Sequence, residues 1–244
     1  MRVKNELWLW ESALTPEKCQ DIIDLGDGIL QKDKENGVDT TALTGAERRY
    51  AGDIDKEKLY QVRKCDVAWF NDQWGYELVH PFVNEANRNA GWNYEWDFSE
   101  DFQYTVYPKG GFYGWHTDQG MSCSFGRYKY DDHNFDEHKE SLQSTIAPCI
   151  IENPTNLVDL HNKIRKLSVT LTLSEPDEYT GGNLEFDDGE FGRSTKTNRY
   201  TELTQIRPQG SIVVFPSYRW HQIKEVKSGI RKSLVLWSCG PPYK

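Results

Sequence analysis

The most regular stretch of this sequence is Leu167-Ser168-Val169-Thr170-Leu171-Thr172-Leu173, in which apolar and hydroxyl side chains alternate strictly. Successive side chains of a β-strand point to opposite faces, so this period of two predicts a strand with one apolar and one polar face. The polar face carries small hydroxyl residues rather than Lys and Glu. This composition favours a cavity wall, although an exposed Thr-rich face would show the same pattern.

The rest of the C-terminal half follows the same period of two. The segment 102–107 alternates in this way and places Gln103, Thr105 and Tyr107 on one face. Apolar runs bounded by turn residues predict further strands at 184–186, 211–215, 222–226 and 233–237. We therefore expect the region after Asn93 to be all-β.

The first part of the chain is predicted to contain a short strand at 7–10 and then an amphipathic helix. Thr15 can cap this helix, and Pro16 suits its first turn. Apolar residues at helical spacing follow, and the helix is predicted to end near Gly26 or Gly28. The polar segment 31–58 is expected to be mostly loop.

A second helix is predicted after a strand at 65–70. Asn71 or Asp72 can cap it, and Gly91 is expected to stop it. Its apolar residues recur at i, i+3 and i+4, which predicts one buried face; they are Leu78, Val79, Phe82, Val83 and Ala86.

Size and composition limit the class of protein. The 244 residues suffice for one domain with a sizeable core. The formal net charge of -9 argues against nucleic acid as a partner, because binding to a phosphate backbone depends on a basic face. The five cysteines are scattered and include no C-x-x-C pair, which indicates neither a disulfide framework nor a thiolate zinc site.

The N-terminal residues lack the apolar core of a signal peptide, and no window of the sequence approaches a membrane span. We therefore expect a soluble, cytoplasmic protein that makes no membrane contact.

The chemistry of the chain is concentrated in Tyr113-Gly114-Trp115-His116-Thr117-Asp118. Residues i and i+2 of an extended chain share a face, so His116 and Asp118 can converge on one metal ion. His221 follows the apolar strand 211–215 and is the candidate for a third ligand. Two imidazoles and one carboxylate with open positions form the facial triad of non-heme iron sites. A lone His-x-Asp pair, in contrast, is more often structural.

Arg231 lies ten residues after His221, in the next predicted strand. Its guanidinium is always charged and can hold a carboxylate through two parallel hydrogen bonds. It is therefore a candidate to bind the far end of a diacid that chelates the metal. Considered alone, Arg231 would instead be a surface arginine in a basic hairpin.

Four groups of residues, in this order and spacing, resemble one enzyme superfamily. They are Tyr107-x5-Tyr113-x2-His116-x-Asp118, Leu171-Thr172-Leu173-Ser174, Gly181-Gly182-x-Leu184 and His221-x9-Arg231-x5-Trp237. Together they resemble the Fe(II)/2-oxoglutarate-dependent oxygenases. Within that superfamily the chain is most similar to the prolyl 4-hydroxylase-like group and its bacterial and viral PKHD-type hydroxylases.

This resemblance implies a mainly β fold with flanking helices. Its core would be a double-stranded β-helix, or jelly roll, with the N-terminal helices packed on the major sheet. We expect a single domain over 1–244, in which 1–92 supports a catalytic core over 93–244. The long, charged and irregular segment 119–165 departs from the short connection of close relatives and is predicted to be a lid-like insertion, because loops of this length are often functional. Its acidic cluster around His133 and His138 could form a second metal site, with an ordinary charged surface as the alternative.

The resemblance also implies roles for individual residues. His116, Asp118 and His221 would bind Fe(II), and Arg231 would pair with the far carboxylate of 2-oxoglutarate. Four further residues would line the cosubstrate pocket, although Thr172 has a shorter reach than the tyrosine that prolyl hydroxylases often place there. They are Tyr107, Thr172, Ile223 and Trp237.

The implied activity is a dioxygenase reaction that uses Fe(II), 2-oxoglutarate and O2, with ascorbate as a further reductant. It would hydroxylate a peptidyl proline in a peptide or protein, as a procollagen-proline 4-dioxygenase-like enzyme does, and release succinate. A free amino acid or another small molecule is the alternative substrate. Two more distant alternatives are a jelly-roll metalloenzyme of another kind, such as an isomerase that would not need Arg231, and a metal-free jelly-roll binding protein.

Overall fold

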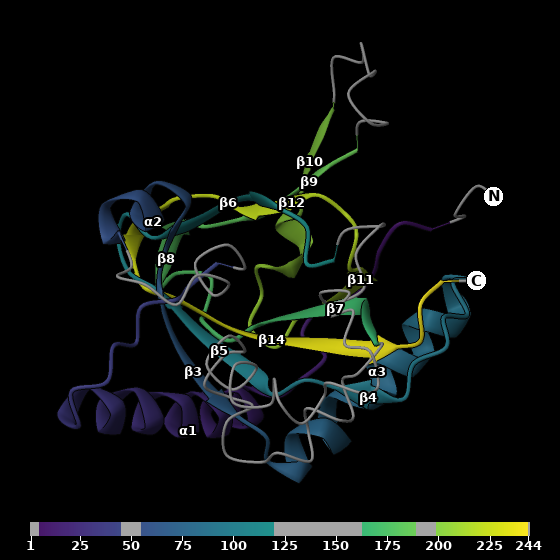
Figure 1. The fold of residues 1–244 in the computed structure, drawn as a ribbon, viewed down its shortest axis with the longest axis horizontal. Helices are drawn as coiled ribbons and strands as arrows, with labels where there is room; N and C mark the ends of the chain where they lie inside the picture. The colour runs from purple at the N-terminus through teal and green to yellow at the C-terminus, as the bar shows by residue number, and fades with distance from the viewer. Residues whose placement is uncertain (1–4, 45–54, 120–162, 189–198, 244) are drawn as a thin grey trace, which may run out of the picture.

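The computed structural model describes residues 5–44, 55–119, 163–188 and 199–243, which form two main antiparallel sheets, a small two-stranded ladder and flanking helices (Figure 1). The large sheet has the order β1-β11-β7-β14-β5-β3, and β4 pairs with β14. Its strands are β1 (Trp8–Trp10), β11 (Ile212–Pro216), β7 (Ile164–Thr172), β14 (Arg231–Gly240), β5 (Phe102–Tyr107), β3 (Asp66–Phe70) and β4 (Phe98–Ser99).

The small sheet has the order β10-β9-β12-β6-β2. Its strands are β10 (Tyr200–Glu202), β9 (Leu184–Asp187), β12 (His221–Ile223), β6 (Phe112–His116) and β2 (Arg63–Lys64). A separate two-stranded ladder joins β13 (Val226–Gly229) to β8 (Tyr179–Gly181), and a 3-10 turn covers Thr204–Ile206. The expected jelly-roll fold, mainly β with flanking helices, is confirmed.

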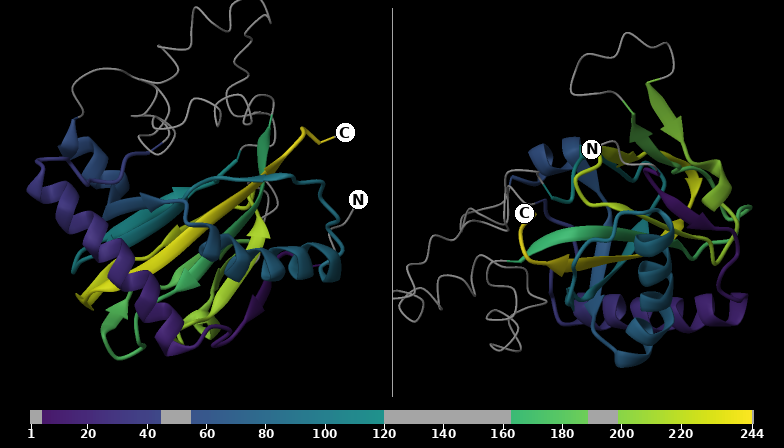
Figure 2. Two further views of the ribbon diagram at one scale, coloured as in Figure 1. Left: turned by 90° about the horizontal axis from the view of Figure 1, so that it is seen from below. Right: turned by 90° about the vertical axis from the view of Figure 1, so that its right-hand side faces the viewer.

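Three α-helices accompany the sheets in the part of the chain that the structure describes. Helices α1 (Pro16–Glu35) and α3 (Gln73–Asn89) lie along the same face of the large sheet, and α2 (Lys56–Val62) lies beside the small sheet (Figures 1 and 2). The expected packing of the N-terminal helices on the major sheet is therefore confirmed. Among the described residues, no helix combines the length and apolarity that crossing a membrane requires.

The alternation of β7 divides the interior into two apolar clusters. Val169 and Leu171 join the helices in a cluster on the outer face of the large sheet. A second cluster contains Tyr107, Phe186 and Phe215 and lies between the two sheets. Ser168, Thr170 and Thr172 are buried, and Ser168 contacts Asp118. The cavity-wall interpretation of this strand is thus preferred over an exposed Thr-rich face.

The predicted start of α1 is confirmed, but the predicted end is wrong. Thr15 Oγ1 accepts a hydrogen bond from the Lys18 backbone N–H at 3.3 Å. The helix then continues past both glycines to Glu35 and ends before Gly37, which has a φ of +74°. Gly37 supplies the left-handed residue that commonly follows a helix C-terminus. The segment 31–58, expected to be mostly loop with a helical turn, contains the end of α1 and the start of α2, and its residues 45–54 lie outside the described part of the chain.

Gly26 remains inside the helix because the helix packs closely on Tyr104. A Cβ atom added at Gly26 would lie 2.4 Å from Tyr104 Cγ and Cδ1, whereas one added at Gly28 would meet nothing within 4 Å. Tyr104 is fully buried and its hydroxyl donates to Asp27 Oδ1 at 2.7 Å, so its ring is held in place. The helix therefore needs glycine at the first position only.

We expect Gly26→Ala to destabilise the protein and Gly28→Ala to stabilise it. Forcing a methyl group against a fixed ring costs about 1–3 kcal/mol, whereas alanine is favoured over glycine in an open helical position by about 0.5–1 kcal/mol. Denaturant unfolding of both variants measures the difference. Equal denaturation midpoints for the two variants would show that the Tyr104 ring moves to accommodate the added methyl group and that the close packing is not required.

Two further predictions about boundaries need correction. The single strand expected at 222–226 is two strands, because the chain leaves β12 after Ile223 and enters β13 at Val226. Asp72 does occupy the N-cap position of α3, but its side chain makes no capping hydrogen bond. Most of the predicted insertion 119–165, with His133 and His138, lies outside the described residues.

Candidate metal centre

Two neighbouring strands, and the short segment that follows one of them, bring the three predicted ligands together. His116 ends β6, His221 begins β12, and these two residues are paired in register. Asp118 follows β6 by two residues. His116 Nε2 lies 3.8 Å from Asp118 Oδ1, and His221 Nε2 lies 3.6 Å from Asp118 Oδ2. One ligand atom from each of the three lies within 4.8 Å of the others, a spacing that a single ion can span.

Backbone carbonyls orient both imidazoles. His116 Nδ1 lies 2.8 Å from the carbonyl oxygen of Gly114, and His221 Nδ1 lies 2.9 Å from that of Arg219. A carbonyl only accepts hydrogen bonds, so Nδ1 carries the proton in each ring. The lone pair of each Nε2 is then free for a metal, and this second hydrogen bond is the usual support of a metal-binding histidine.

The protonation states also suit a cation. Burial, together with the charge of His221, lowers the pKa of His116 to about 3. Burial alone would raise the pKa of Asp118, but the two imidazoles, Arg165 and Ser168 outweigh it and hold that pKa below its ordinary value. At neutral pH the site therefore offers a neutral imidazole at His116 and an ionised carboxylate at Asp118, the forms that bind Fe(II).

Ser168 holds the carboxylate from the opposite sheet. Its hydroxyl donates to Asp118 Oδ2 at 2.6 Å and is also hydrogen-bonded to the Ser217 hydroxyl at 2.9 Å. Ser168 is 1% exposed, so neither bond competes with bulk water. The large sheet thus fixes one ligand atom of a site whose imidazoles belong to the small sheet.

We expect Ser168→Ala to weaken metal binding by about 10–100-fold, the usual effect of losing a hydrogen-bond partner of a metal ligand. Titration of the metal-free protein with Mn(II), followed by electron paramagnetic resonance, measures the affinity. Thr170→Val removes a hydroxyl from the same face of β7 and serves as the control. An unchanged affinity in Ser168→Ala would mean that the carboxylate orients itself.

Arg231 is a buried guanidinium next to Tyr107. Its side chain is 2% exposed, its Nη1 donates to Ser233 Oγ at 3.0 Å, and its Cζ lies 5.4 Å from the centre of the Tyr107 ring. The described residues provide no carboxylate that pairs with it. Burying an uncompensated charge is costly, so this arrangement suits an anionic ligand.

The remaining predicted pocket residues lie around this centre. Thr172 is buried and pairs in register with Ser233, the hydrogen-bond partner of Arg231. Ile223 is buried and pairs with Tyr113 across the small sheet. Trp237 is 6% exposed, and its indole nitrogen is buried without a hydrogen-bond partner among the described residues. Their contact with a cosubstrate stays a prediction.

Several residues near the metal site had no predicted role. Tyr113 stacks on His116 with ring centres 3.6 Å apart, and the Arg63 guanidinium lies 4.4 Å from the centre of the Tyr113 ring. Arg165 forms two hydrogen bonds of 2.5 Å with Glu100 and lies over the Trp237 ring. Tyr113 stands in the quoted motif, but the two arginines carry no local signal, because strand pairing between distant segments brings them here.

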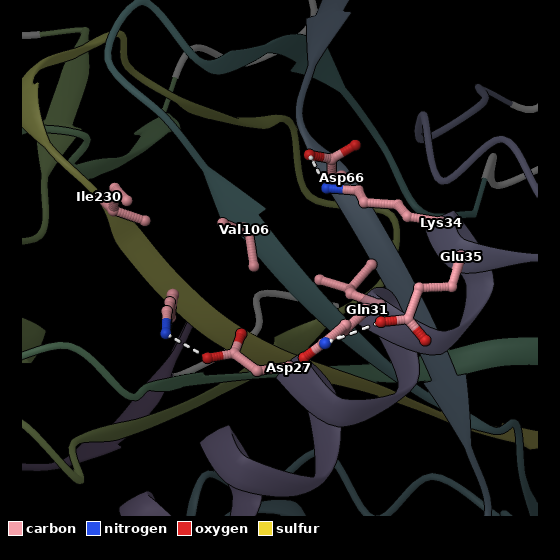
Figure 3. A pocket seen from close by; sticks show the side chains of 9 residues that line it. Asp27, Gln31, Lys34, Glu35, Asp66, Val106 and Ile230 are labelled. Atoms are coloured by element: carbon pink, nitrogen blue, oxygen red, sulfur yellow. Dashed lines mark hydrogen bonds and ion pairs between the residues drawn. The ribbon is translucent and has the colours of Figure 1, made fainter. Parts of the chain in front are cut away.

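A surface groove of about 560 Å³ is separate from this centre. It lies between the C-terminal half of α1 and the strands β3, β5 and β14 (Figure 3). Its charged groups already pair with one another: Lys232 with Asp27 at 2.6 Å, and Lys34 with Asp66 at 3.3 Å. None of the three predicted metal ligands lines it, and it lies on the helix side of the large sheet.

Known proteins share the sequence pattern of this region. The 2OG-Fe(II) oxygenase superfamily matches residues 102–239. A PKHD-type hydroxylase of Acinetobacter baumannii strain ATCC 17978 is 38% identical over 71 residues, which are 29% of this chain and 27% of that protein. A PKHD-type hydroxylase of Verminephrobacter eiseniae is 29% identical over 112 residues, 46% of this chain and 40% of that protein. The chain thus matches less than half the length of either relative.

Solved structures share the fold over nearly the whole chain. The viral collagen prolyl hydroxylase of Paramecium Bursaria Chlorella virus-1, in its 2OG complex, has a TM-score of 0.55 at 16% identity and covers 97% of each chain. A Pseudomonas putida prolyl-4-hydroxylase also has a TM-score of 0.55, at 14% identity, with 96% and 92% covered. A Trichoplax adhaerens prolyl hydroxylase in complex with a hypoxia inducible factor peptide fragment scores 0.52 at 12% identity, with 96% and 84% covered.

Proposed function

Because this chain belongs to the 2OG-Fe(II) oxygenase superfamily, we propose that it is a dioxygenase that hydroxylates a proline in a peptide or protein. The cofactors of the family are Fe(II), 2-oxoglutarate and O2. The observation that carries the proposal is the convergence of His116, Asp118 and His221 near a buried Arg231 that has no described carboxylate partner. The donor set matches ferrous iron, and the unpaired guanidinium matches a diacid.

His116, Asp118 and His221 are the proposed iron ligands. Their Nε2 and carboxylate oxygen atoms would hold the ion, and a set of two imidazoles and one carboxylate would leave further positions on it for other ligands. When bound, Fe(II) and 2-oxoglutarate supply the oxidative decarboxylation to succinate that activates O2 for hydroxylation. Gly114, Arg219 and Ser168 hold the three ligands in place through hydrogen bonds, so binding requires little rearrangement.

Arg231 is the proposed partner of the far carboxylate of 2-oxoglutarate. Its planar fork can make two parallel hydrogen bonds, and the low exposure of the site strengthens them. Tyr107 and Thr172 provide hydroxyl groups nearby, while Ile223 and Trp237 provide apolar walls. These residues would orient the keto acid and exclude water from it.

Proline in a peptide is the substrate we favour, because the fold is shared with prolyl hydroxylases and one of these is in complex with a peptide fragment. The carboxylate of Asp118 favours hydroxylation, since related halogenases lack this ligand. Ascorbate as an auxiliary reductant, a cytoplasmic location and a single catalytic domain over the chain are further parts of the proposal. A free amino acid is the alternative substrate.

Uncoupled turnover tests the proposal without a known substrate. The purified protein, supplied with Fe(II), 2-oxoglutarate and ascorbate in air, should slowly form succinate. Peptide libraries incubated with the same mixture should then be examined by mass spectrometry for products that have gained one oxygen atom. Absence of succinate from protein with a full complement of iron would refute the dioxygenase activity.

A further inference from the structure

A second buried guanidinium belongs to Arg63, on the edge strand β2. The residue is 4% exposed. Its Nε donates to Cys65 Sγ at 3.1 Å, and its Nη1 donates to the Leu43 carbonyl oxygen at 3.2 Å. Its Nη2 is buried and has no hydrogen-bond partner among the described residues. Two N–H donors of a charged group are therefore left without an acceptor, which is costly unless a ligand supplies one.

One aromatic ring, Tyr113, connects Arg63 to the candidate metal centre. Arg63 and His116 both contact the ring of Tyr113. Burial raises the pKa of the Tyr107 hydroxyl, while Arg63 and Arg231 both act to lower it, so the two guanidinium groups act on the same side chain. Arg63 and Arg231 thus both lie close to Tyr107, although they come from different sheets.

No described group balances the charge of Arg63. Burial raises the pKa of the Cys65 thiol, so the sulfur that it contacts is neutral at neutral pH. Two other arginines of the region already have carboxylate partners: Arg165 pairs with Glu100, and Arg219 pairs with Asp188. Of the arginines near the candidate metal centre, Arg63 and Arg231 are thus the two without a carboxylate partner among the described residues.

The charges of the loaded site leave Arg63 unmatched. The two positive charges of a ferrous ion would be met by Asp118 and by the metal-bound carboxylate of 2-oxoglutarate. The other carboxylate of 2-oxoglutarate would meet Arg231. Arg63 would then carry a positive charge that no anion from the described residues meets, in surroundings where an unpaired buried charge is strongly unfavourable.

We propose that Arg63 binds a carboxylate of the substrate. This inference rests on the proposed function and narrows its substrate class, because it favours a free amino acid or a peptide with a carboxylate close to the hydroxylated carbon. The Nη2 donors would bind the carboxylate, and the stacked Tyr113 ring would hold the guanidinium plane in position. A neutral peptide segment would leave the Arg63 charge unpaired.

The same carboxylate chemistry could come from 2-oxoglutarate itself, so the first experiment separates the two sources. Isothermal titration of the Mn(II)-loaded protein measures 2-oxoglutarate affinity in wild type, Arg63→Met and Arg231→Met. We expect Arg231→Met to weaken this affinity by roughly tenfold or more and Arg63→Met to stay close to wild type. An equal loss in both variants would assign Arg63 to the cosubstrate and overturn the inference.

The second experiment uses formate as the smallest carboxylate probe. Crystals of wild-type protein with Mn(II) and 2-oxoglutarate are soaked in sodium formate, so the result does not depend on how a variant folds. Formate density on Arg63 Nη2, with 2-oxoglutarate on the metal, is expected. If no formate density lies at Arg63 Nη2, or if an acidic side chain of the protein binds there instead, the inference is refuted. If 2-oxoglutarate does not bind the wild-type protein, the proposed function is refuted instead.

Variants at β2 complete the test in solution. Arg63→Met should weaken binding of formate to the Mn(II) and 2-oxoglutarate complex by roughly tenfold or more. Lys64→Met removes an exposed charge from the same strand and should bind formate as wild type does. If both variants lose formate equally, the attraction is a general effect of surface charge, and Arg63 has no specific role.

Discussion

Replacing Asp118 with alanine should abolish iron-dependent succinate formation. Asp118 is the only carboxylate among the three converging residues, and it lies within 4 Å of both imidazoles. Without it the ion would keep two neutral ligands and no charge to offset its own. Removing a residue that only hydrogen-bonds to a metal ligand typically lowers metal affinity or activity by about 10–100-fold. Removing the ligand itself should therefore lower both metal affinity and turnover by more than that.

The measurement compares Mn(II) affinity and succinate formation in wild type, Asp118→Ala and Asp118→Asn. Asparagine keeps the shape and one oxygen atom but removes the charge, so it separates the electrostatic contribution from the geometric one. Thermal unfolding of the metal-free proteins shows whether each variant is folded. Turnover by folded Asp118→Ala at the wild-type rate would eliminate the dioxygenase proposal.

The parts of the fold that the sequence predicts well are those with local periodicity. Strand β7 shows its two faces in the alternation of Ser168, Thr170 and Thr172 with leucine and valine, and the structure buries the hydroxyl face toward the metal centre. The spacing of His116 and Asp118 is equally local. Pairing between β6 and β12 then brings in His221, as the ordered motifs predicted.

The parts that sequence reasoning missed depend on partners far along the chain. Gly26 looked like the end of a helix, because a sequence does not show that Tyr104 will lie against it. Arg63 carries no motif, since its meaning arises only when β2 pairs with β6 and places it on Tyr113. A glycine or an arginine has several structural uses, and tertiary contacts choose among them.

Arg231→Met should weaken 2-oxoglutarate binding and yet stabilise the ligand-free protein. Charge-assisted hydrogen bonds contribute about 1.5–3 kcal/mol each, so loss of the guanidinium should lower the affinity by roughly one to two orders of magnitude. In the ligand-free protein the same guanidinium is 2% exposed and lacks a carboxylate from the described residues. Replacing a poorly compensated buried charge with an apolar side chain is often neutral or stabilising.

The two effects are read from one set of unfolding curves. Thermal unfolding with Mn(II), with and without 2-oxoglutarate, gives the stability of the ligand-free protein and the increase that the ligand produces. Lys232→Met is the matched control, because Lys232 is the next residue of β14 but faces the helices, where it pairs with Asp27 at 2.6 Å. Lys232→Met should keep the full increase in stability on adding 2-oxoglutarate.

Arg231→Met should lose that increase in stability while its metal affinity stays unchanged. The opposite result is a ligand-free Arg231→Met protein that is less stable than wild type and still gains stability from 2-oxoglutarate. Arg231 would then be a structural residue, and the diacid would bind elsewhere.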